Sequence, residues 1–351
     1  MTIPYYNILW ISAENEQLII DYAAEKKSKG NVHHARLKYS LDSVPIFKRQ
    51  PFIEGLLNRA YSQVPRRRRA KVLINPHAGP GGATRSWEND VKPIFEAARM
   101  ILDVVTTSRS GEGIDICEAL DIDAYDVIVI CSGDGLAYEA FNGFGKRADA
   151  RSALQKVAIA HIPCGSGNAM SCNLNGSNAV GASALAVVKG VRTPMDLMSV
   201  TQGDRRILSF LSQSVGIIAE ADLGTENMRW LGAKRFDLGV AQRIFSKKVY
   251  PCDIAVKIEL ESKDEVKAHY KRIRNGEEGQ KNDEPSLSST VPGPDAAEGL
   301  PPLRFGTVND QLPENWQVTS HDKLGNFYCG NVSFTFSLRR QASKGGAHCF
   351  Y

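Results

Sequence analysis

Residues 127–135 read VIVICSGDG, and this stretch decides how the rest of the chain is interpreted. The run of apolar, mostly β-branched residues that ends at Ile130 predicts a strand buried on both faces. Gly133 and Gly135 carry no Cβ, so backbone N–H groups in this turn can approach a ligand closely. A short helix is expected from residue 136 to residue 143, with its N-terminus at the same place. A strand, a glycine turn and a helix start in this order predict a binding site for an anion.

A carboxylate stands inside this predicted anion site. A loop that only binds phosphate is better without the negative charge of Asp134, because like charges repel. Asp134 therefore suggests catalysis, or a metal ion held against phosphate groups. The other interpretation is a tight turn in which Asp134 caps the following helix. These residues alone leave both interpretations open.

Length and composition exclude several classes of protein. A chain of 351 residues suggests two domains, and 42% apolar with 23% charged residues is typical of a soluble globular protein. A formal charge of +4 does not by itself indicate nucleic acid. We expect no signal peptide and no membrane span, because the apolar runs are too short. The seven cysteines form no CxxC pair, which predicts a reducing compartment and no structural zinc. Cys131 and Cys164 flank glycine loops. They are either buried thiols or redox switches.

The first 65 residues predict a small strand-rich extension. Two strands are expected within residues 3–22, a polar loop at 26–34 and a short helix at 52–61. The four arginines at 66–69 follow. Such a run can bind anionic lipid headgroups or act as a nuclear localisation signal. It can also be a solvent-exposed stretch that leads into the next strand.

From residue 70 onward, strands and helices alternate. The expected strands are 71–75, 101–107, 126–130 and 157–162, and the expected helices between them include 84–99 and 113–120. Such alternation predicts a parallel α/β sheet whose strand ends meet at one ligand-binding edge. Glycine-rich turns at 76–82, 133–135 and 163–168 stand at that edge and indicate a polyphosphate ligand. No GxxxxGK[ST] motif occurs and no GxGxxG follows a strand, so backbone N–H groups and arginines must hold the phosphates.

The pattern changes after residue 190. We expect strands at 195–200 and 207–219, a helical stretch at 222–245, a strand pair at 254–265, a disordered insertion at 275–302, strand-like residues at 316–336 and an irregular tail at 337–351.

Three blocks in this order resemble a known family. They are SGDG at 132–135 with Glu139, PCGSGNA at 163–169, and Asp222 with Arg229 and Arg235. Together they resemble the sphingosine kinase branch of the diacylglycerol-kinase-like lipid kinases, with the fungal sphingoid long-chain-base kinases as the nearest match. The resemblance covers roughly residues 69–328.

The resemblance implies a two-domain kinase of the α/β class. Residues 66–194 would form the ATP-binding catalytic domain, and residues 195–336 an antiparallel β-sandwich that holds the lipid. Family members carry a late Asp-Gly-Glu element near the ATP phosphates. No counterpart follows Gly330, so the sandwich is expected to be incomplete.

The resemblance also implies site residues. Asp134 would be the base that takes the proton of the lipid hydroxyl, and Asp222 would pair with the amine of the sphingoid base. The residues implied in ATP binding are Asn75, Pro76, His77, Thr107, Ser108, Arg109, Ser110, Gly111, Glu139, Gly165, Ser166, Gly167, Arg229 and Arg235. The residues implied in substrate binding are Ser132, Gly133, Gly135, Ser212 and Asp222. Without the resemblance, the charges from residue 222 to 235 would suit a solvated helix.

The expected activity is ATP-dependent phosphorylation of the primary hydroxyl of a sphingoid long-chain base, with ATP and Mg²⁺ as cofactors. No protein residue is expected to be a dedicated metal ligand. One alternative is a truncated nucleotide-binding fragment with little or no activity. Another is a ceramide or diacylglycerol kinase, against which Asp222 argues because those lipids carry no cationic amine. The expected location is the cytoplasm, with peripheral contact to a membrane surface and no nucleic-acid partner.

Overall fold

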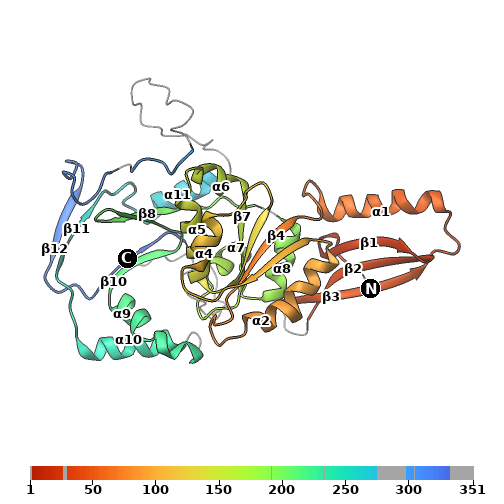
Figure 1. Ribbon diagram of the computed structural model, residues 1–351. Coiled ribbons are helices and arrows are strands. Elements are labelled where there is room, and N and C mark those ends of the chain that lie inside the picture. Colours follow the sequence, from red (N-terminus) through yellow and green to blue (C-terminus); the bar gives the residue numbers. More distant parts are fainter. Residues whose placement is uncertain are drawn as a thin grey trace, which may run out of the picture.

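The computed structural model describes residues 2–26, 30–190, 192–231, 234–274, 298–303 and 305–332. Its elements are arranged along one long axis (Figure 1). A three-stranded sheet with α1 (Ile46–Tyr61) forms one end, and a parallel sheet covered by helices forms the middle. Pairs of antiparallel strands, with α9 (Ile217–Gly224) and α10 (Lys234–Ser246), form the other end.

Four strands form the parallel sheet, in the order β5-β4-β6-β7. Their bounds are β4 (Arg69–Ile74), β5 (Ile101–Thr106), β6 (Val127–Ser132) and β7 (Ala158–Pro163). All residues of β6 are buried, and β4 and β7 pair with it in parallel. The predicted α/β class and the buried strand before the Gly-Asp-Gly turn are both confirmed.

Helices cover both faces of this sheet. One face carries α2 (Ala83–Ser86), the π-helical turn η2 (Trp87–Val91), α3 (Lys92–Ala97) and α8 (Val180–Lys189). The other carries α4 (Glu112–Glu118), α5 (Asp134–Gly145), α6 (Ala150–Lys156) and α7 (Ala169–Asn175). Alternate side chains of β6 enter the two cores, Val129 on one side and Ile130 on the other. The single helix expected at 84–99 is interrupted, because η2 inserts a π-helical turn between α2 and α3.

The N-terminal sheet is antiparallel, in the order β1-β2-β3. It consists of β1 (Ile8–Glu14), which follows the short 3₁₀ turn η1 (Tyr5–Asn7), β2 (Gln17–Glu25) and β3 (Val32–Ser40). The two strands expected within 3–22 are confirmed. The polar loop expected at 26–34 is wrong at its end, because β3 begins at Val32. The helix expected at 52–61 starts earlier, at Ile46. It includes Pro51 as its sixth residue, where the missing N–H removes one intrahelical hydrogen bond.

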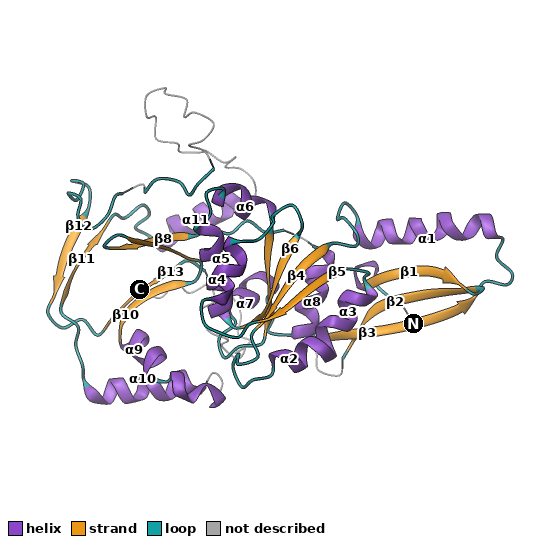
Figure 2. Cartoon of the chain, in the orientation of Figure 1, coloured by secondary structure: helices purple, strands orange, loops and turns teal. Residues whose placement is uncertain are grey.

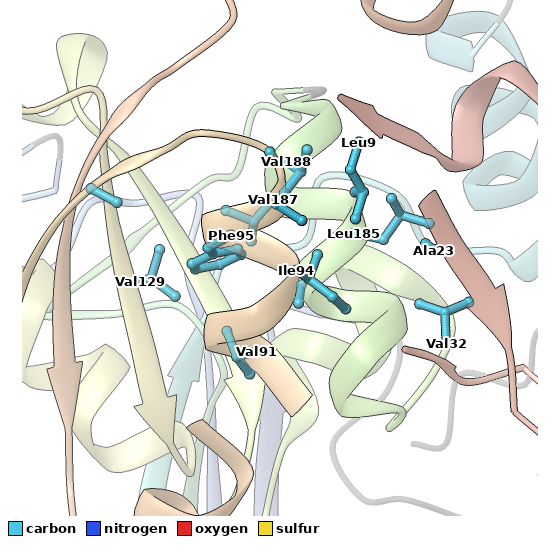
Figure 3. Close-up of a cluster of buried hydrophobic side chains, with 14 of the residues drawn as sticks. Leu9, Ala23, Val32, Val91, Ile94, Phe95, Val129, Leu185, Val187 and Val188 are labelled. Carbon is cyan, nitrogen blue, oxygen red and sulfur yellow. The ribbon is translucent and has the colours of Figure 1, made fainter. Parts of the chain in front are cut away.

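This N-terminal sheet shares a core with the parallel sheet. Side chains from β1, β2 and β3 pack against α3 and α8, which cover one face of the parallel sheet (Figure 3). The shared cluster includes Leu9, Ala23, Val32, Ile94, Phe95, Leu185 and Val188. The extension therefore supplies part of the wall of the central core.

Lys189, the last residue of α8, is buried where α8 meets the N-terminal sheet. Its Nζ donates hydrogen bonds to the carbonyl oxygens of Ile8 (2.6 Å) and Ala60 (3.1 Å). The same nitrogen lies 4.2 Å from the centroid of the Tyr61 ring. Burial lowers the pKa of this ammonium group to about 8.

We expect the wild-type chain to gain stability relative to Lys189→Met as the pH rises from 7 to 9. The folded pKa lies below the ordinary value of 10.5, so the unfolded chain binds more protons in this range. The free energy of unfolding then rises with pH, by about 1 kcal/mol over this interval. Urea unfolding of both proteins at each pH measures the difference. A difference that does not change with pH would contradict the lowered pKa.

The four arginines at 66–69 make internal contacts. Arg66 donates to Glu54 and Asn58, and the Arg67 guanidinium lies over the Trp10 ring. Arg68 donates to the carbonyl oxygens of Val187 and Val188, and the N–H of Arg69 donates to Asp126. Burial lowers the pKa of Arg68, whose guanidinium binds the C-terminal carbonyl groups of α8. The interpretation as a solvated stretch is therefore wrong for Arg68, and the other three arginines also hold neighbouring elements together.

The chain after residue 194 forms three separate two-stranded antiparallel sheets within the described residues (Figure 2). The pairs are β8 (Met198–Gln202) with β9 (Arg205–Ser209), β10 (Ser212–Gly216) with β13 (Asn326–Gly330), and β11 (Cys252–Val256) with β12 (Gln317–His321). The predicted antiparallel character is confirmed. A sandwich built from these strands stays a prediction.

Two strand predictions in this part are wrong. The strand expected at 207–219 is divided into β9 and β10, and α9 begins at Ile217. The strand pair expected at 254–265 is β11 followed by α11 (Lys263–Arg274). A capping box starts α11, because the hydroxyl of Ser262 accepts the N–H of Glu265 (3.1 Å) and the Glu265 carboxylate accepts the N–H of Ser262 (3.0 Å). The S-x-x-E pattern in the sequence was the available signal for this helix.

Of the insertion predicted at 275–302, residues 275–297 lie outside the described residues. Residues 298–302 are packed against the α/β part, so the prediction of disorder is wrong for them. The carbonyl of Glu298 accepts the N–H of Arg151 at 2.8 Å, and Leu300 lies beside Gly145. The tail at 337–351 lies outside the described residues. Across the part of the chain that is described, no helix combines the length and apolarity needed to cross a bilayer.

Candidate active site

The three glycine-rich turns meet at the carboxyl ends of β4, β6 and β7. A Cβ on Gly79 would lie 2.9 Å from the carbonyl carbon of Gly165, and a Cβ on Gly133 would lie 2.8 Å from the oxygen of Gly167. A Cβ on Gly165 would overlap the Cα of Gly133. Backbones pack this closely only where no side chain intervenes. The predicted convergence of the three turns at one edge of the sheet is therefore present.

The first turn of α5 faces open space beside these loops. Gly135, its second residue, is exposed, and a Cβ placed there would meet no atom within 4 Å. The start of a helix offers N–H groups and the positive end of the helix dipole. The phosphate group predicted at this turn stays a prediction.

The carboxylate of Asp134 binds the N-terminus of α7. Oδ2 accepts the N–H of Ala169 (2.8 Å), and Oδ1 accepts the N–H of Met170 (2.9 Å). Asp134 does cap a helix, but that helix is α7 and not α5, which follows the turn. Each carboxylate oxygen accepts one amide and keeps a second lone pair, so the cap is compatible with a proton-accepting role.

His161, on β7, supports the same turn and was not among the predicted site residues. Its Nδ1 accepts the N–H of Ser171 (3.2 Å), so Nε2 carries the proton and donates to the carbonyl oxygen of Ser132 (3.0 Å). Burial lowers the pKa of His161, although the nearby charge of Asp134 opposes that shift. A histidine within an apolar strand gave no sequence signal for this contact.

Two asparagines shape the first and third loops. The side-chain oxygen of Asn75 accepts the N–H of His77 at 3.0 Å, as expected of an Asn-Pro turn. The side chain of Asn168 closes the third loop, because it accepts the N–H of Gly165 and donates to the carbonyl of Gly165, both at 2.8 Å. Asn168 belonged to the recognised motif, but its role was not predicted.

The segment 107–111, expected to bind ATP, is held by α4. Glu112 accepts hydrogen bonds from the N–H (2.6 Å) and hydroxyl (2.9 Å) of Ser108, and from the N–H of Arg109 (3.2 Å). The bond from the Ser108 N–H is the main cause of the lowered pKa of Glu112. The Arg109 guanidinium pairs with Asp115 and points one Nη at the carbonyl of Ser110, at 3.5 Å. Thr107 is buried at the end of β5.

Glu139, on α5, binds the backbone at the start of α4. Its two carboxylate oxygens accept the N–H groups of Gly111 and Gly113, each at 3.0 Å. The carboxylate therefore joins α5 to the 107–111 segment and orients that segment beside the glycine loops. Its predicted support of a nucleotide would act through this backbone.

The thiols next to these loops are protonated at neutral pH. Burial raises the pKa of Cys131 and raises that of Cys164 to about 11. This favours the interpretation of both as buried thiols over redox switches.

In the part of the chain after residue 194, Asp222 and Arg235 are in contact. Asp222 lies on α9, and its Oδ1 is 2.6 Å from Nη2 of Arg235 at the start of α10. They were predicted to bind different ligands, the amine and ATP, yet the fold brings them together. Ser212 begins β10 opposite Gly330. Arg229 lies in the 3₁₀ segment η3 (Glu226–Leu231), and its side chain is not described. The roles predicted for these residues stay predictions.

The described residues contain no group of three or more His, Cys, Asp or Glu side chains placed to hold a metal ion. Asp134 and Glu139, the carboxylates beside the glycine turns, offer oxygen donors, which is the ligand type that Mg²⁺ prefers.

Two family models match the chain. The diacylglycerol kinase catalytic domain matches residues 69–200, and a domain of unknown function matches residues 1–62. The chain is 43% identical over 227 residues to sphingoid long chain base kinase 5 of Saccharomyces cerevisiae, covering 64% of this chain and 33% of that protein. It is 37% identical over 275 residues to sphingoid long chain base kinase 4 of Schizosaccharomyces pombe, covering 78% of this chain and 58% of that protein.

More distant similarities are also found. The chain is 32% identical over 197 residues to human sphingosine kinase 1, covering 53% of this chain and 51% of that protein. Among solved structures, a putative diacylglycerol kinase from Bacillus anthracis is 20% identical and aligns with a TM-score of 0.43, over 55% of this chain and 61% of that one. The chain thus spans 33% and 58% of the lengths of the two yeast kinases.

Proposed function

We propose that this chain is an ATP-dependent lipid kinase acting on sphingoid long-chain bases, because residues 69–200 match the model of the diacylglycerol kinase catalytic domain. The product would be the 1-phosphate of the base. The observation that carries the proposal is the meeting of three glycine turns around Asp134, beside the open first turn of α5. The names of the relatives, sphingoid long chain base kinases and sphingosine kinases, support the same substrate class.

The site residues suit phosphoryl transfer to an alcohol. A primary hydroxyl is a poor nucleophile at neutral pH, so a carboxylate that accepts its proton lowers the barrier. In the proposed reaction the Asp134 carboxylate takes that proton, the hydroxyl oxygen bonds to the γ-phosphorus, and the bond to ADP breaks. ATP with Mg²⁺ supplies the phosphoryl group and offsets the charge that develops on it. The amide bonds from Ala169 and Met170 fix the carboxylate in one position.

The proposed recognition of the lipid rests on Asp222. A sphingoid base carries a cationic amine, and an ammonium group taken out of water needs an anionic partner. Ceramide and diacylglycerol carry no such charge. The exposed half of the Asp222 side chain would bind this amine.

Phosphate transfer from labelled ATP–Mg²⁺ tests the proposal. Sphingosine and phytosphingosine are offered alongside ceramide and diacylglycerol, and the lipid products are separated and counted. Product from the free bases alone is expected. Product from ceramide or diacylglycerol would overturn the substrate class. ATP binding without any lipid product would mean that this chain keeps a nucleotide site but lacks the reaction.

We further propose that α10 contacts the membrane surface in which the lipid resides. Leu238 and Phe245 stand seven residues apart on one helix face, 52% and 85% exposed, and Ile244 is also exposed. Lys234, the first residue of α10, and Lys247, which follows its last residue, are exposed and suit anionic headgroups. Figure 1 draws α10 along the outer edge of the molecule.

Replacing both Leu238 and Phe245 by Ser is expected to weaken binding to vesicles that contain phosphatidylserine. The loss of two inserted apolar side chains should lower the fraction bound roughly tenfold or more. Sedimentation with vesicles measures it. Tyr270→Ser, an exposed aromatic residue on α11, is the matched control. Equal losses for control and double variant would contradict a role for α10.

A further inference from the structure

The start of α7 is held by two side chains, that of Asp134, which follows β6, and that of His161 on β7. The Asp134 carboxylate accepts the N–H groups of Ala169 (2.8 Å) and Met170 (2.9 Å). Nδ1 of His161 accepts the next N–H along the helix, that of Ser171, at 3.2 Å. The first three N–H groups of α7 have no partner within the helix, and these two side chains satisfy all of them.

His161 also holds the turn that carries Asp134. Its Nε2 donates to the carbonyl oxygen of Ser132 at 3.0 Å, and Ser132 is the last residue of β6. Asp134 and His161 therefore form two bridges between the same two segments, residues 132–134 and residues 169–171. Neither segment can shift relative to the other without loss of hydrogen bonds from both bridges.

The two bonds of His161 require one chemical state of the ring. An imidazole that accepts at Nδ1 and donates at Nε2 is neutral and has a single tautomer. Its side chain is buried. This burial lowers the pKa of His161, against the opposing effect of the Asp134 charge, and a lowered pKa favours the neutral ring.

The helix on the other side of these bridges is itself anchored. The hydroxyl of Ser171 donates to the carbonyl of Ser177 and lies 3.1 Å from the hydroxyl oxygen of Ser183 on α8. Both Ser171 and Ser183 are buried. Because α7 is fixed to α8 in this way, the turn takes its position from α7 through His161.

We propose that His161 is a positioning residue, which holds the turn at 132–134 against α7 and so fixes the Asp134 carboxylate where the substrate hydroxyl approaches it. The inference rests on the proposed function, in which Asp134 is the base. A shift of about 1 Å in a catalytic group can cost roughly 10²-fold in rate, so the position of this carboxylate matters. His161 is buried and acts only through Asp134.

Kinetics test the effect on the reaction. His161→Phe keeps a flat ring and removes both hydrogen bonds. It is expected to lower kcat for sphingosine roughly 10- to 100-fold, while the KM values for ATP and sphingosine change less than about twofold. A rise in either KM with an unchanged kcat would overturn the inference.

Two further variants of His161 each keep one of the two bonds. The oxygen of an asparagine side chain occupies the place of Nδ1 and can still accept from Ser171, whereas the nitrogen of a glutamine side chain reaches the place of Nε2 and can still donate to Ser132. Both His161→Asn and His161→Gln are expected to lose less kcat than His161→Phe. They also decide the question if His161→Phe does not fold, because a normal kcat in both would overturn the inference.

Lys189→Met is the matched control. It also removes a buried polar side chain that bonds to two backbone groups, but those groups belong to Ile8 and Ala60, in β1 and α1. We expect it to lose stability while kcat changes less than about twofold. An equal loss of kcat in Lys189→Met and His161→Phe would show that the effect comes from lost stability alone.

Amide hydrogen exchange, measured without ligands, tests the position of the carboxylate independently of activity. In His161→Phe the N–H of Ser171 loses its own acceptor and exchanges faster in any case. The N–H groups of Ala169 and Met170 bond to Asp134, so they should exchange roughly tenfold faster only if His161 holds that carboxylate in place. In Lys189→Met these two amides should keep their protection relative to the rest of α7. Unchanged exchange at Ala169 and Met170 in His161→Phe would overturn the inference.

A double-mutant cycle tests whether His161 acts through Asp134. In the Asp134→Asn background, His161→Phe should lower kcat little further, because the base that it positions is already absent. Additive losses would overturn the inference. If the wild-type chain phosphorylates no sphingoid base, the proposed function fails, and the exchange of Ala169 and Met170 alone then decides whether His161 fixes the carboxylate.

Discussion

Asp134→Asn is expected to lower kcat for phosphate transfer to sphingosine roughly 10²- to 10⁴-fold, the usual contribution of a positioned general base. The amide of asparagine has nearly the same shape as the carboxylate, but its nitrogen accepts no proton. Affinity for ATP should fall much less, because the glycine turns that meet here are made of backbone. Steady-state kinetics and direct binding of a fluorescent ATP analogue measure the two effects separately.

The same substitution should also destabilise the site. The carboxylate accepts two backbone N–H groups at the start of α7, and an asparagine side chain offers one acceptor and one donor. One of the amides would then face an N–H donor, at a cost of about 1–3 kcal/mol. Thermal unfolding in the absence of ligands measures this loss of stability independently of activity.

Glu139→Gln is the matched control for Asp134→Asn. Glu139 also accepts two backbone N–H groups, those of Gly111 and Gly113, so its amide variant loses the same kind of contact. A similar loss of stability is expected, with a much smaller loss of kcat. If both variants lose kcat equally, Asp134 is a structural cap and the assignment of the base is wrong.

Gly165→Ala is expected to pull the three glycine turns apart. A Cβ at this position would overlap the backbone of Gly133, and backbone atoms cannot yield as the end of a flexible side chain can. The free energy of unfolding should fall by about 1–3 kcal/mol or more. A shift of the turns by about 1 Å would also lower the rate of phosphate transfer roughly 10²-fold.

Gly82→Ala is the control for Gly165→Ala. It lies in the first glycine turn, has a negative φ of −95°, and a Cβ there would meet no atom within 4 Å. Its effect on stability should stay within about 0.5 kcal/mol, as for other surface substitutions. Equal effects of the two alanines would show that the turns do not pack as closely as described. Urea unfolding and the kinase assay together make the comparison.

The parallel sheet was predictable because its strands are buried on both faces. The run VIVI at 127–130 is short, β-branched and followed by a glycine turn, which together favour a buried strand over a buried helix. Strand β3 was missed because Val32 is the only buried residue among Val32–Ser40, so its polar residues read as a loop. Helix α11 was missed because the alternating apolar residues Val256, Ile258 and Leu260 favour a strand, although Ser262 and Glu265 form a capping box.

The sequence predicted which turns form the site better than it predicted which side chains contact one another there. The motifs named the turns that meet, since parallel strands end at one edge. They could not show that Asp134 caps α7, a helix that begins 35 residues later, because that contact depends on tertiary packing. For the same reason they could not show that Arg235 binds Asp222. His161 gave no signal, since a buried histidine and a surface one look alike in sequence.

The shared core between the N-terminal sheet and the helices over the parallel sheet decides how this protein can be divided. The two matched segments, 1–62 and 69–200, are separate as patterns of sequence, yet Leu9 and Val32 are buried against Ile94 and Leu185. Removing the first segment would strip the outer wall from α3 and α8 and leave an apolar surface open to water. The two segments should therefore unfold together as one cooperative unit. A protein that contained the second segment without the first would need another element to cover α3 and α8.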